Sequence, residues 1–149
     1  MQHIIEHIDY DYNGFCEIMQ KLCAQYGFLK YETVGKSVFG RAIPSLRLGN
    51  ASDYVLYTAA TSGSHRITTT VLLKFIAELC DALKNGKKLS DVDICSAMFG
   101  RGVIFVPIVN PDGCEISLKG ANGCLGHSSR IYKLCGGDFE HWDSNLRGI

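Results

Sequence analysis

Residues 54–83, YVLYTAATSGSHRITTTVLLKFIAELCDAL, decide the fold of this chain. They begin with a short apolar run of β-branched and aromatic side chains, which predicts a buried strand over residues 54–58. The last part, residues 67–83, places apolar side chains at the spacing of one helix face. A strand followed by a long amphipathic helix predicts the α/β class.

A small polar loop, Thr61-Ser62-Gly63-Ser64-His65, joins the predicted strand to the predicted helix. Ligands and catalytic groups of α/β proteins often lie beyond the carboxyl ends of strands, so we expect the functional site at this loop. Two other roles suit the same residues. Ser62 or Ser64 would cap the helix, or the hydroxyls and backbone N–H groups at its N-terminus would bind an anion.

The part of the chain before this unit predicts one helix and two strands. Apolar residues at helical spacing favour a helix over residues 10–26, ended by Gly27. Residues 31–38 and 43–48 alternate well enough for two strands joined by a turn. We expect the helix to be core material with no role in chemistry.

The sequence pattern after residue 83 is less regular. We predict a short helix over residues 90–98 with Ser90 as its cap. A strongly apolar run predicts a strand over residues 103–109 that is buried on both faces, ended by a turn at residues 110–113. Glycines interrupt the chain from Cys114 onward, so we expect irregular structure there.

The composition is that of an ordinary globular domain. The chain has 149 residues, 46% hydrophobic and 20% charged, which favours a single domain. Lys+Arg and Asp+Glu both number 15, so no net field attracts nucleic acid or an anionic membrane. The longest apolar run, residues 103–109, is far too short to cross a bilayer. We expect neither a nucleic-acid nor a membrane partner.

The cysteines and the N-terminus favour a cytoplasmic protein. The seven cysteines are an odd number without a C-x-x-C pair, which is typical of reduced thiols. The first residues lack the basic and apolar regions of a secretory signal. Cys124, His127 and Cys135 lie close together in sequence, but their spacing matches no zinc pattern, and a loop is the better interpretation.

Four motifs in order resemble the zinc carboxypeptidase family, the carboxypeptidase A-like metallopeptidases. Residues 34–41 resemble the family's G-x-S-x-x-G-R hairpin, and residues 67–75 the helix after its first metal motif. Residues 106–113 resemble its P-x-x-N-P-D-G segment. Residues 138–148 resemble the W-x-x-N-x-R-G segment of the bacterial branch that cleaves γ-D-glutamyl–diaminopimelate bonds in cell-wall peptides.

The resemblance implies a fold, a cofactor and a substrate. The fold would be a three-layer α/β/α domain with a mixed sheet, of which residues 1–149 form a single partial domain. Two His and one carboxylate hold the family's zinc, which activates a water molecule and polarises the scissile carbonyl. A Glu serves as general base, and an Arg stabilises the oxyanion. The implied substrate is a peptide with a free carboxylate, such as a peptidoglycan fragment.

The implied metal site departs from the family's pattern. The first two zinc ligands come from H-x-x-E, and these positions fall on Ser62 and His65. The third His ligand and the general base lie, in the family, beyond residue 149. The catalytic Arg has its counterpart at Arg147, which is otherwise a solvated residue near the end of the chain. We therefore expect this chain to bind zinc weakly or not at all and to lack peptidase activity.

His65 and Ser62 leave several interpretations open. His65 would be one ligand of an altered metal site, a relic of the family loop, or a polar residue at a helix start. Ser62 and His65 would be a nucleophile and base only with a third, orienting group, which the sequence does not supply. The alternative function is a non-catalytic peptide- or anion-binding module that uses loop 61–65. A sheet cut in mid-domain would also expose an edge that favours self-association.

Overall fold

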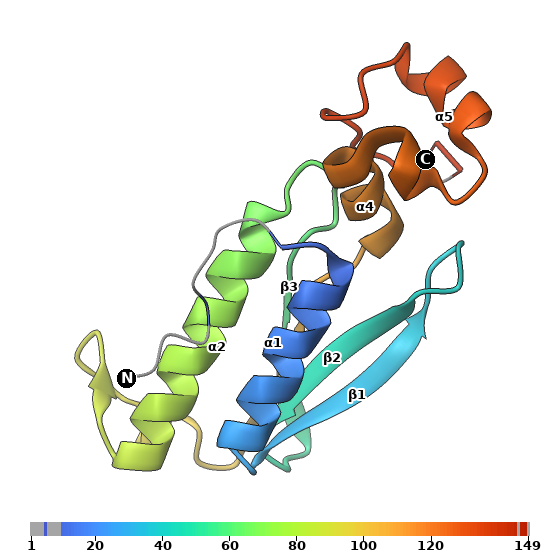
Figure 1. Cartoon of the computed structure of the whole chain (residues 1–149). Coiled ribbons are helices and arrows are strands. Elements are labelled where there is room, and N and C mark those ends of the chain that lie inside the picture. Colours follow the sequence, from blue (N-terminus) through green and yellow to red (C-terminus); the bar gives the residue numbers. More distant parts are fainter. Residues whose placement is uncertain (1–4, 6–9, 146, 149) are drawn as a thin grey trace.

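Helices and strands alternate along the chain in the computed structural model, which describes residues 5, 10–145 and 147–148 (Figure 1). The main sheet contains β1 (Leu29–Lys36), β2 (Ala42–Leu48), β3 (Asp53–Thr58) and β6 (Arg101–Val106). The helices are α1 (Tyr12–Gln25), α2 (Ile67–Asn85), α3 (Ile94–Ala97), α4 (Pro111–Lys119) and α5 (Ser128–Cys135), with the 3-10 helix η1 (Gly120–Cys124). A small hairpin pairs β4 (Lys88–Leu89) with β5 (Val92–Asp93).

The sheet is mixed, as predicted. Its strand order is β1-β2-β6-β3. The pairs β1–β2 and β2–β6 are antiparallel, whereas β3 runs parallel to β6 in a register that pairs Tyr57 with Phe105. The long helix α2 lies between β3 and β6 in sequence, which makes this pair a β-α-β crossover. Because β3 and β6 are parallel, their carboxyl ends lie at the same end of the sheet.

Helices α1 and α2 lie side by side over one face of the sheet (Figure 1). Leu46 of β2 and Phe105 of β6 point into this layer and are fully buried. The ring of Phe75 from α2 lies 5.8 Å from Tyr57 and 6.3 Å from Phe105, which ties α2 to the parallel pair. The predicted apolar stripe of α1 is buried here as well: Phe15, Ile18, Met19 and Leu22.

Strand β3 lies at an edge of the sheet and is exposed, so the predicted burial of residues 54–58 is wrong. Val55, Leu56 and Tyr57 expose 49%, 60% and 43% of their surface. The apolar run indicated a strand correctly, but it could not show which side of that strand has a neighbour. One backbone edge and several large apolar side chains therefore remain uncovered.

Several predicted element ends are wrong. Strand β6 ends at Val106 rather than at residue 109. Asp93, not Ser90, caps the short helix α3 by accepting a hydrogen bond from the Ser96 N–H group. Helix α1 ends at Gln25, and Tyr26 rather than Gly27 is its C-cap residue. Local sequence left these choices open, because several polar or glycine residues near each end have cap chemistry.

Residues 111–135 are mostly helical, which corrects the predicted turn and the irregular structure expected there, whereas residues 136–145 and 147–148 are irregular as predicted. Asn110 caps α4 through its side chain, and Pro111 occupies the first turn, where its missing N–H costs nothing. Helices α4, η1 and α5 gather at one end of the sheet around a second small core (Figure 1). That core consists of Ile116, Cys124, Ile131 and Trp142.

All seven cysteines lie within residues 10–145 and are unpaired, as predicted. Burial raises the pKa of Cys80 and of Cys114 to about 12, so both remain protonated thiols. No helix within the described residues is long and apolar enough to span a membrane.

We predict that the β3 edge drives self-association. Leu56→Lys places a charge on the exposed strand, and like charges at an edge oppose strand pairing between molecules. Light scattering during size exclusion should show wild-type oligomers that L56K reduces or abolishes. The control is Val92→Lys, at a side chain that is 51% exposed on the separate β4–β5 hairpin. A wild-type protein that is monomeric at all concentrations would contradict this prediction.

Candidate functional site

Loop 61–65 follows the carboxyl end of β3, beside the segment that follows β6. Beyond the paired strands the two segments stay joined by hydrogen bonds from Val109 N to Ala59 O (3.1 Å) and from Asn110 N to Ala60 O (2.9 Å). The loop therefore starts from a fixed backbone, in the position where α/β sheets often bind ligands.

Gly63 lies in close contact with two other segments of backbone. A β-carbon at this position would come within 2.3 Å of the Trp142 carbonyl oxygen and 2.6 Å of the Gly113 carbonyl oxygen. The N–H group of Gly63 donates to the Asp143 carbonyl oxygen at 3.1 Å. Only glycine allows this approach, which joins the loop to the start of α4 and to the segment around residue 143.

Asp143 is the residue that sequence reasoning missed. Its Oδ1 atom accepts hydrogen bonds from the Ser62 hydroxyl at 2.6 Å and from the Ser64 hydroxyl. These bonds, helped by the nearby charge of His65, hold the pKa of the Asp143 carboxyl below its usual range. The two serines lie about 80 positions earlier in the chain, so no local pattern could have paired them with Asp143.

The structure places the predicted site residues differently. The hydroxyls of Ser62 and Ser64 bind Asp143 and do not cap α2, so the predicted capping role is wrong. His65 is exposed; its carbonyl oxygen accepts a 2.7 Å hydrogen bond from the Thr68 hydroxyl. Arg147 is exposed, and its backbone N–H donates to Asn145 Oδ1 at 2.8 Å. Ser62 and His65 lie in one turn of the loop. Leu146, which precedes Arg147, lies outside the described residues.

The side chains at the loop do not form the family's zinc-binding set. Among residues 5, 10–145 and 147–148, no three His, Cys, Asp or Glu side chains are close enough to share a metal ion. The neutral Ser62 hydroxyl donates a hydrogen bond to the Asp143 carboxylate, whereas zinc prefers thiolate, imidazole and carboxylate ligands. His127, part of the other candidate group, stacks on Phe39 with ring centroids 5.3 Å apart.

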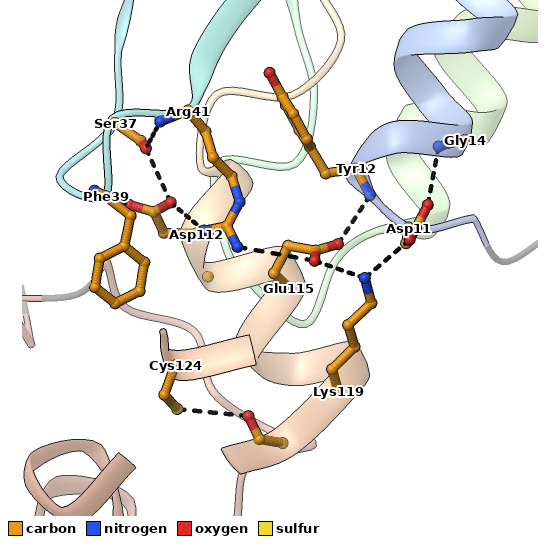
Figure 2. A network of polar contacts seen from close by, with 12 residues as sticks. Asp11, Tyr12, Gly14, Ser37, Phe39, Arg41, Asp112, Glu115, Lys119 and Cys124 are labelled. Atoms are coloured by element: carbon orange, nitrogen blue, oxygen red, sulfur yellow. Dashed lines mark hydrogen bonds and ion pairs between the residues drawn. The ribbon is translucent and has the colours of Figure 1, made fainter. Parts of the chain in front are cut away.

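A buried carboxylate holds the β1–β2 hairpin against α4 (Figure 2). Asp112 is 2% exposed, and its Oδ1 atom lies 2.7 Å from the Arg41 guanidinium. The same carboxylate accepts hydrogen bonds from the Ser37 hydroxyl and the Phe39 N–H, both at 2.9 Å. The residues of the hairpin motif and of the N-P-D-G motif thus contact each other directly.

The polar network continues from α4 to the start of α1 (Figure 2). Glu115 accepts a 2.8 Å hydrogen bond from the Tyr12 N–H and pairs with Lys119 at 2.8 Å. Lys119 also lies 2.8 Å from Asp11, and this hydrogen bond lowers the pKa of Asp11 and raises the pKa of Lys119. Helix α4 is therefore fixed to both the hairpin and α1.

Asn110 connects α4 to the last described segment. Its Oδ1 accepts the Gly113 N–H at 3.0 Å, and its Nδ2 donates to the Ser144 carbonyl oxygen at 3.2 Å. The loop, the start of α4 and residues 142–145 therefore form one unit at the end of the parallel strands. This unit offers hydroxyl, amide and carboxylate groups, which suit the binding of a polar ligand.

A sequence model described as zinc carboxypeptidase matches residues 15–141. Gamma-D-glutamyl-L-diamino acid endopeptidase 1 of Lysinibacillus sphaericus is 28% identical over 143 residues, which cover 95% of this chain and 36% of that protein. Uncharacterized protein YqgT of Bacillus subtilis (strain 168) is 27% identical over 144 residues, covering 94% of this chain and 38% of that protein. The chain spans little more than a third of the length of these relatives.

The fold is also that of solved carboxypeptidases. The crystal structure of carboxypeptidase A from Helicoverpa armigera matches with a TM-score of 0.60 and 22% sequence identity, over 91% of this chain and 28% of that chain. At this identity the likeness shows the fold alone. Together with the sequence matches, it confirms the predicted resemblance and the α/β fold with a mixed sheet.

We predict that Asp112→Asn costs about 3 kcal/mol of unfolding free energy, because it removes the nearer of the two carboxylates that face the largely buried Arg41. Urea denaturation measures the loss. The control is Glu32→Gln, which breaks the exposed Arg47–Glu32 pair and should cost less than about 1 kcal/mol. Equal losses for the two variants would show that the Asp112 pair does not stabilise the hairpin contact.

We predict that Gly63→Ala costs about 1–3 kcal/mol, because the new β-carbon would force apart three backbone segments. The single tryptophan, Trp142, is 5% exposed, so its fluorescence should shift to the red when this contact opens. Gly27→Ala is the matched control, since a β-carbon there has no neighbour within 4 Å. An unchanged Trp142 spectrum in G63A would refute the close contact.

Proposed function

This chain belongs to the zinc carboxypeptidase family, and we propose that it binds peptides with a free carboxylate at loop 61–65 without hydrolysing them. The observation that carries this proposal is the binding of the Ser62 and Ser64 hydroxyls to Asp143. A hydroxyl–carboxylate cluster takes the place of the first zinc motif. The result is a binding module with a peptidase-like fold.

The chemistry of the donor groups supports this proposal. Zinc bound at the loop would compete with two hydroxyl donors for the Asp143 carboxylate. Ser62 would be a weak ligand, because a neutral hydroxyl is hard to deprotonate. His65 alone supplies an imidazole at this loop, and one imidazole does not hold a catalytic zinc ion. We therefore propose that the chain neither requires zinc nor uses Arg147 to stabilise an oxyanion.

The peptide class and the compartment are also proposals. The name of the Lysinibacillus sphaericus relative refers to γ-D-glutamyl–diamino acid bonds, which supports cell-wall peptides as ligands. Unpaired cysteines are typical of a reducing compartment, which supports a cytoplasmic location. In that setting the ligands would be peptidoglycan fragments rather than the intact wall.

Zinc-dependent hydrolysis is the second candidate, and the electrostatic influence of His65 on Asp143 favours it. The charge of His65 contributes to the lowered pKa of Asp143, so an imidazole and an ionised carboxylate lie near each other. Both are zinc ligand types. An altered metal site would need to recruit Asp143 in place of the family's Glu, together with a further ligand.

We predict that Ser62→His with His65→Glu raises zinc affinity at least tenfold, because it restores both ligand types of the H-x-x-E motif. Calorimetric zinc titration and metal analysis after dialysis measure the gain. The control carries the same exchange on separate segments, Ser52→His with His141→Glu, and should bind zinc as the wild type does. Chromatography of a γ-D-glutamyl–diaminopimelate tripeptide, with and without a chelator, tests binding and cleavage together.

The wild-type protein should bind this tripeptide equally well in the presence of the chelator and leave it intact. Stoichiometric zinc that survives dialysis, together with cleavage that the chelator stops, would overturn the binding-module proposal. The same result would favour the His65–Asp143 metal site. Absence of any tripeptide binding would refute both candidates for this ligand class.

A further inference from the structure

Cys124 and Cys135, which the sequence places in one glycine-rich segment, face the same small core in the structure. Cys124 ends η1 and is fully buried, and its thiol donates to the Gly120 carbonyl oxygen at 3.4 Å (Figure 2). Cys135 ends α5 and is half-buried against the same core. His127, which lies between them in sequence, stacks on Phe39 instead. The segment therefore presents two thiols to one core.

A reverse turn after η1 brings the two cysteines to this core. Residues 125–126 are in the left-handed conformation, with φ of 44° and 87°, and the His127 N–H donates to the Cys124 carbonyl oxygen at 2.9 Å. Helix α5 begins directly after this turn and packs against η1. Ile131, one helical turn before Cys135, is fully buried in the same core. This face of α5 is therefore directed inward, toward Cys124.

The two thiols differ in their access to solvent. Burial, together with the nearby thiol of Cys135, raises the pKa of Cys124, so the Cys124 thiol stays protonated and away from a dissolved oxidant. Cys135 is half-buried, and Gly136 and Gly137 follow it in the left-handed conformation. Because glycine adopts this conformation at no steric cost, the end of α5 has the backbone freedom to bring its thiol to Cys124. An accessible thiol beside a buried one suits an attacking and a resolving cysteine.

We propose that Cys124 and Cys135 form a reversible disulfide when the protein meets a low-molecular-weight disulfide such as oxidised glutathione. The Cys135 thiolate attacks one sulfur of the oxidant, breaks its S–S bond and releases one glutathione molecule. The Cys124 thiolate then attacks the Cys135 sulfur and releases the second glutathione molecule. The protein loses two electrons and two protons, and the oxidant gains both.

The disulfide would join η1 to α5 around Trp142. Trp142 belongs to this core, and its carbonyl oxygen lies against Gly63 of loop 61–65. The bond would therefore stabilise the segment that supplies Asp143 to the loop. In a reducing compartment the bond forms only under oxidative conditions. The pair would thus make the stability of this end of the molecule depend on the redox state.

The test treats the folded full chain with oxidised glutathione, blocks the remaining thiols with N-ethylmaleimide and digests the product with trypsin. Cleavage leaves Cys124 in peptide 120–130 and Cys135 in peptide 134–147, each with a single cysteine, so mass spectrometry identifies their link directly. We expect this linked pair to be at least about tenfold more abundant than any other cysteine pair, because the fold holds the two thiols at a high effective concentration. Dithiothreitol should abolish it.

Three variants separate the two steps. Cys124→Ala should trap the mixed disulfide with glutathione on Cys135, whereas Cys135→Ser should leave Cys124 unmodified. Cys95→Ser is the matched control, since Cys95 is exposed and lies outside this core. Its removal should leave the linked pair unchanged.

Oxidation of the wild type should raise the Tm by about 5 °C, because the link closes the loop 125–134 in the unfolded chain. C135S should show no such rise. Recovery of both thiols as maleimide adducts after oxidation, or links spread evenly over the seven cysteines, would overturn the proposal. A lower Tm of the oxidised wild type would also overturn it, since the bond would then form only when the core is broken. These readouts use neither a peptide ligand nor a metal.

Discussion

The neutralisation of one buried carboxylate, Asp112, is the constraint on which the rest of this structure depends. An unpaired charge at 2% exposure would cost several kcal/mol, so Arg41, the Ser37 hydroxyl and the Phe39 N–H must all come to it. Those groups belong to the hairpin tip, more than 70 positions earlier in the chain. These contacts hold the β1–β2 hairpin against α4.

Close contacts between backbone segments also fix the start of α4. Gly63 permits contact with the Trp142 and Gly113 carbonyls, and Asn110 connects the cap of α4 to Ser144. The ion pair and the glycine therefore both act at the start of α4. Together they bring the hairpin, the loop and residues 142–145 to the carboxyl end of the parallel strands. A site assembled in this way has little freedom to rearrange around a ligand.

The sequence allows the β3–α2 unit, the mixed α/β class and the family to be predicted, because these rest on periodicity and on motifs in order. Helix α4 was missed because N-P-D-G has the composition of a turn, although Asn110 and Pro111 equally suit a helix start. The exposure of β3 and the role of Asp143 could not be predicted. Both depend on which distant segment lies alongside, and local patterns contain no such information.

The position of Asp143 changes how the two substituted ligands should be understood. Ser62 and His65 occupy the positions at which the family resemblance implies a His and a Glu ligand. Two hydroxyls donate to one oxygen of the Asp143 carboxylate and lower its pKa, so the polar side chains of the loop have hydrogen-bond partners. A metal ion would have to displace those hydroxyls from Asp143. Ser62, Ser64 and Asp143 thus act as one unit, and metal ligands introduced at positions 62 and 65 would also break that unit.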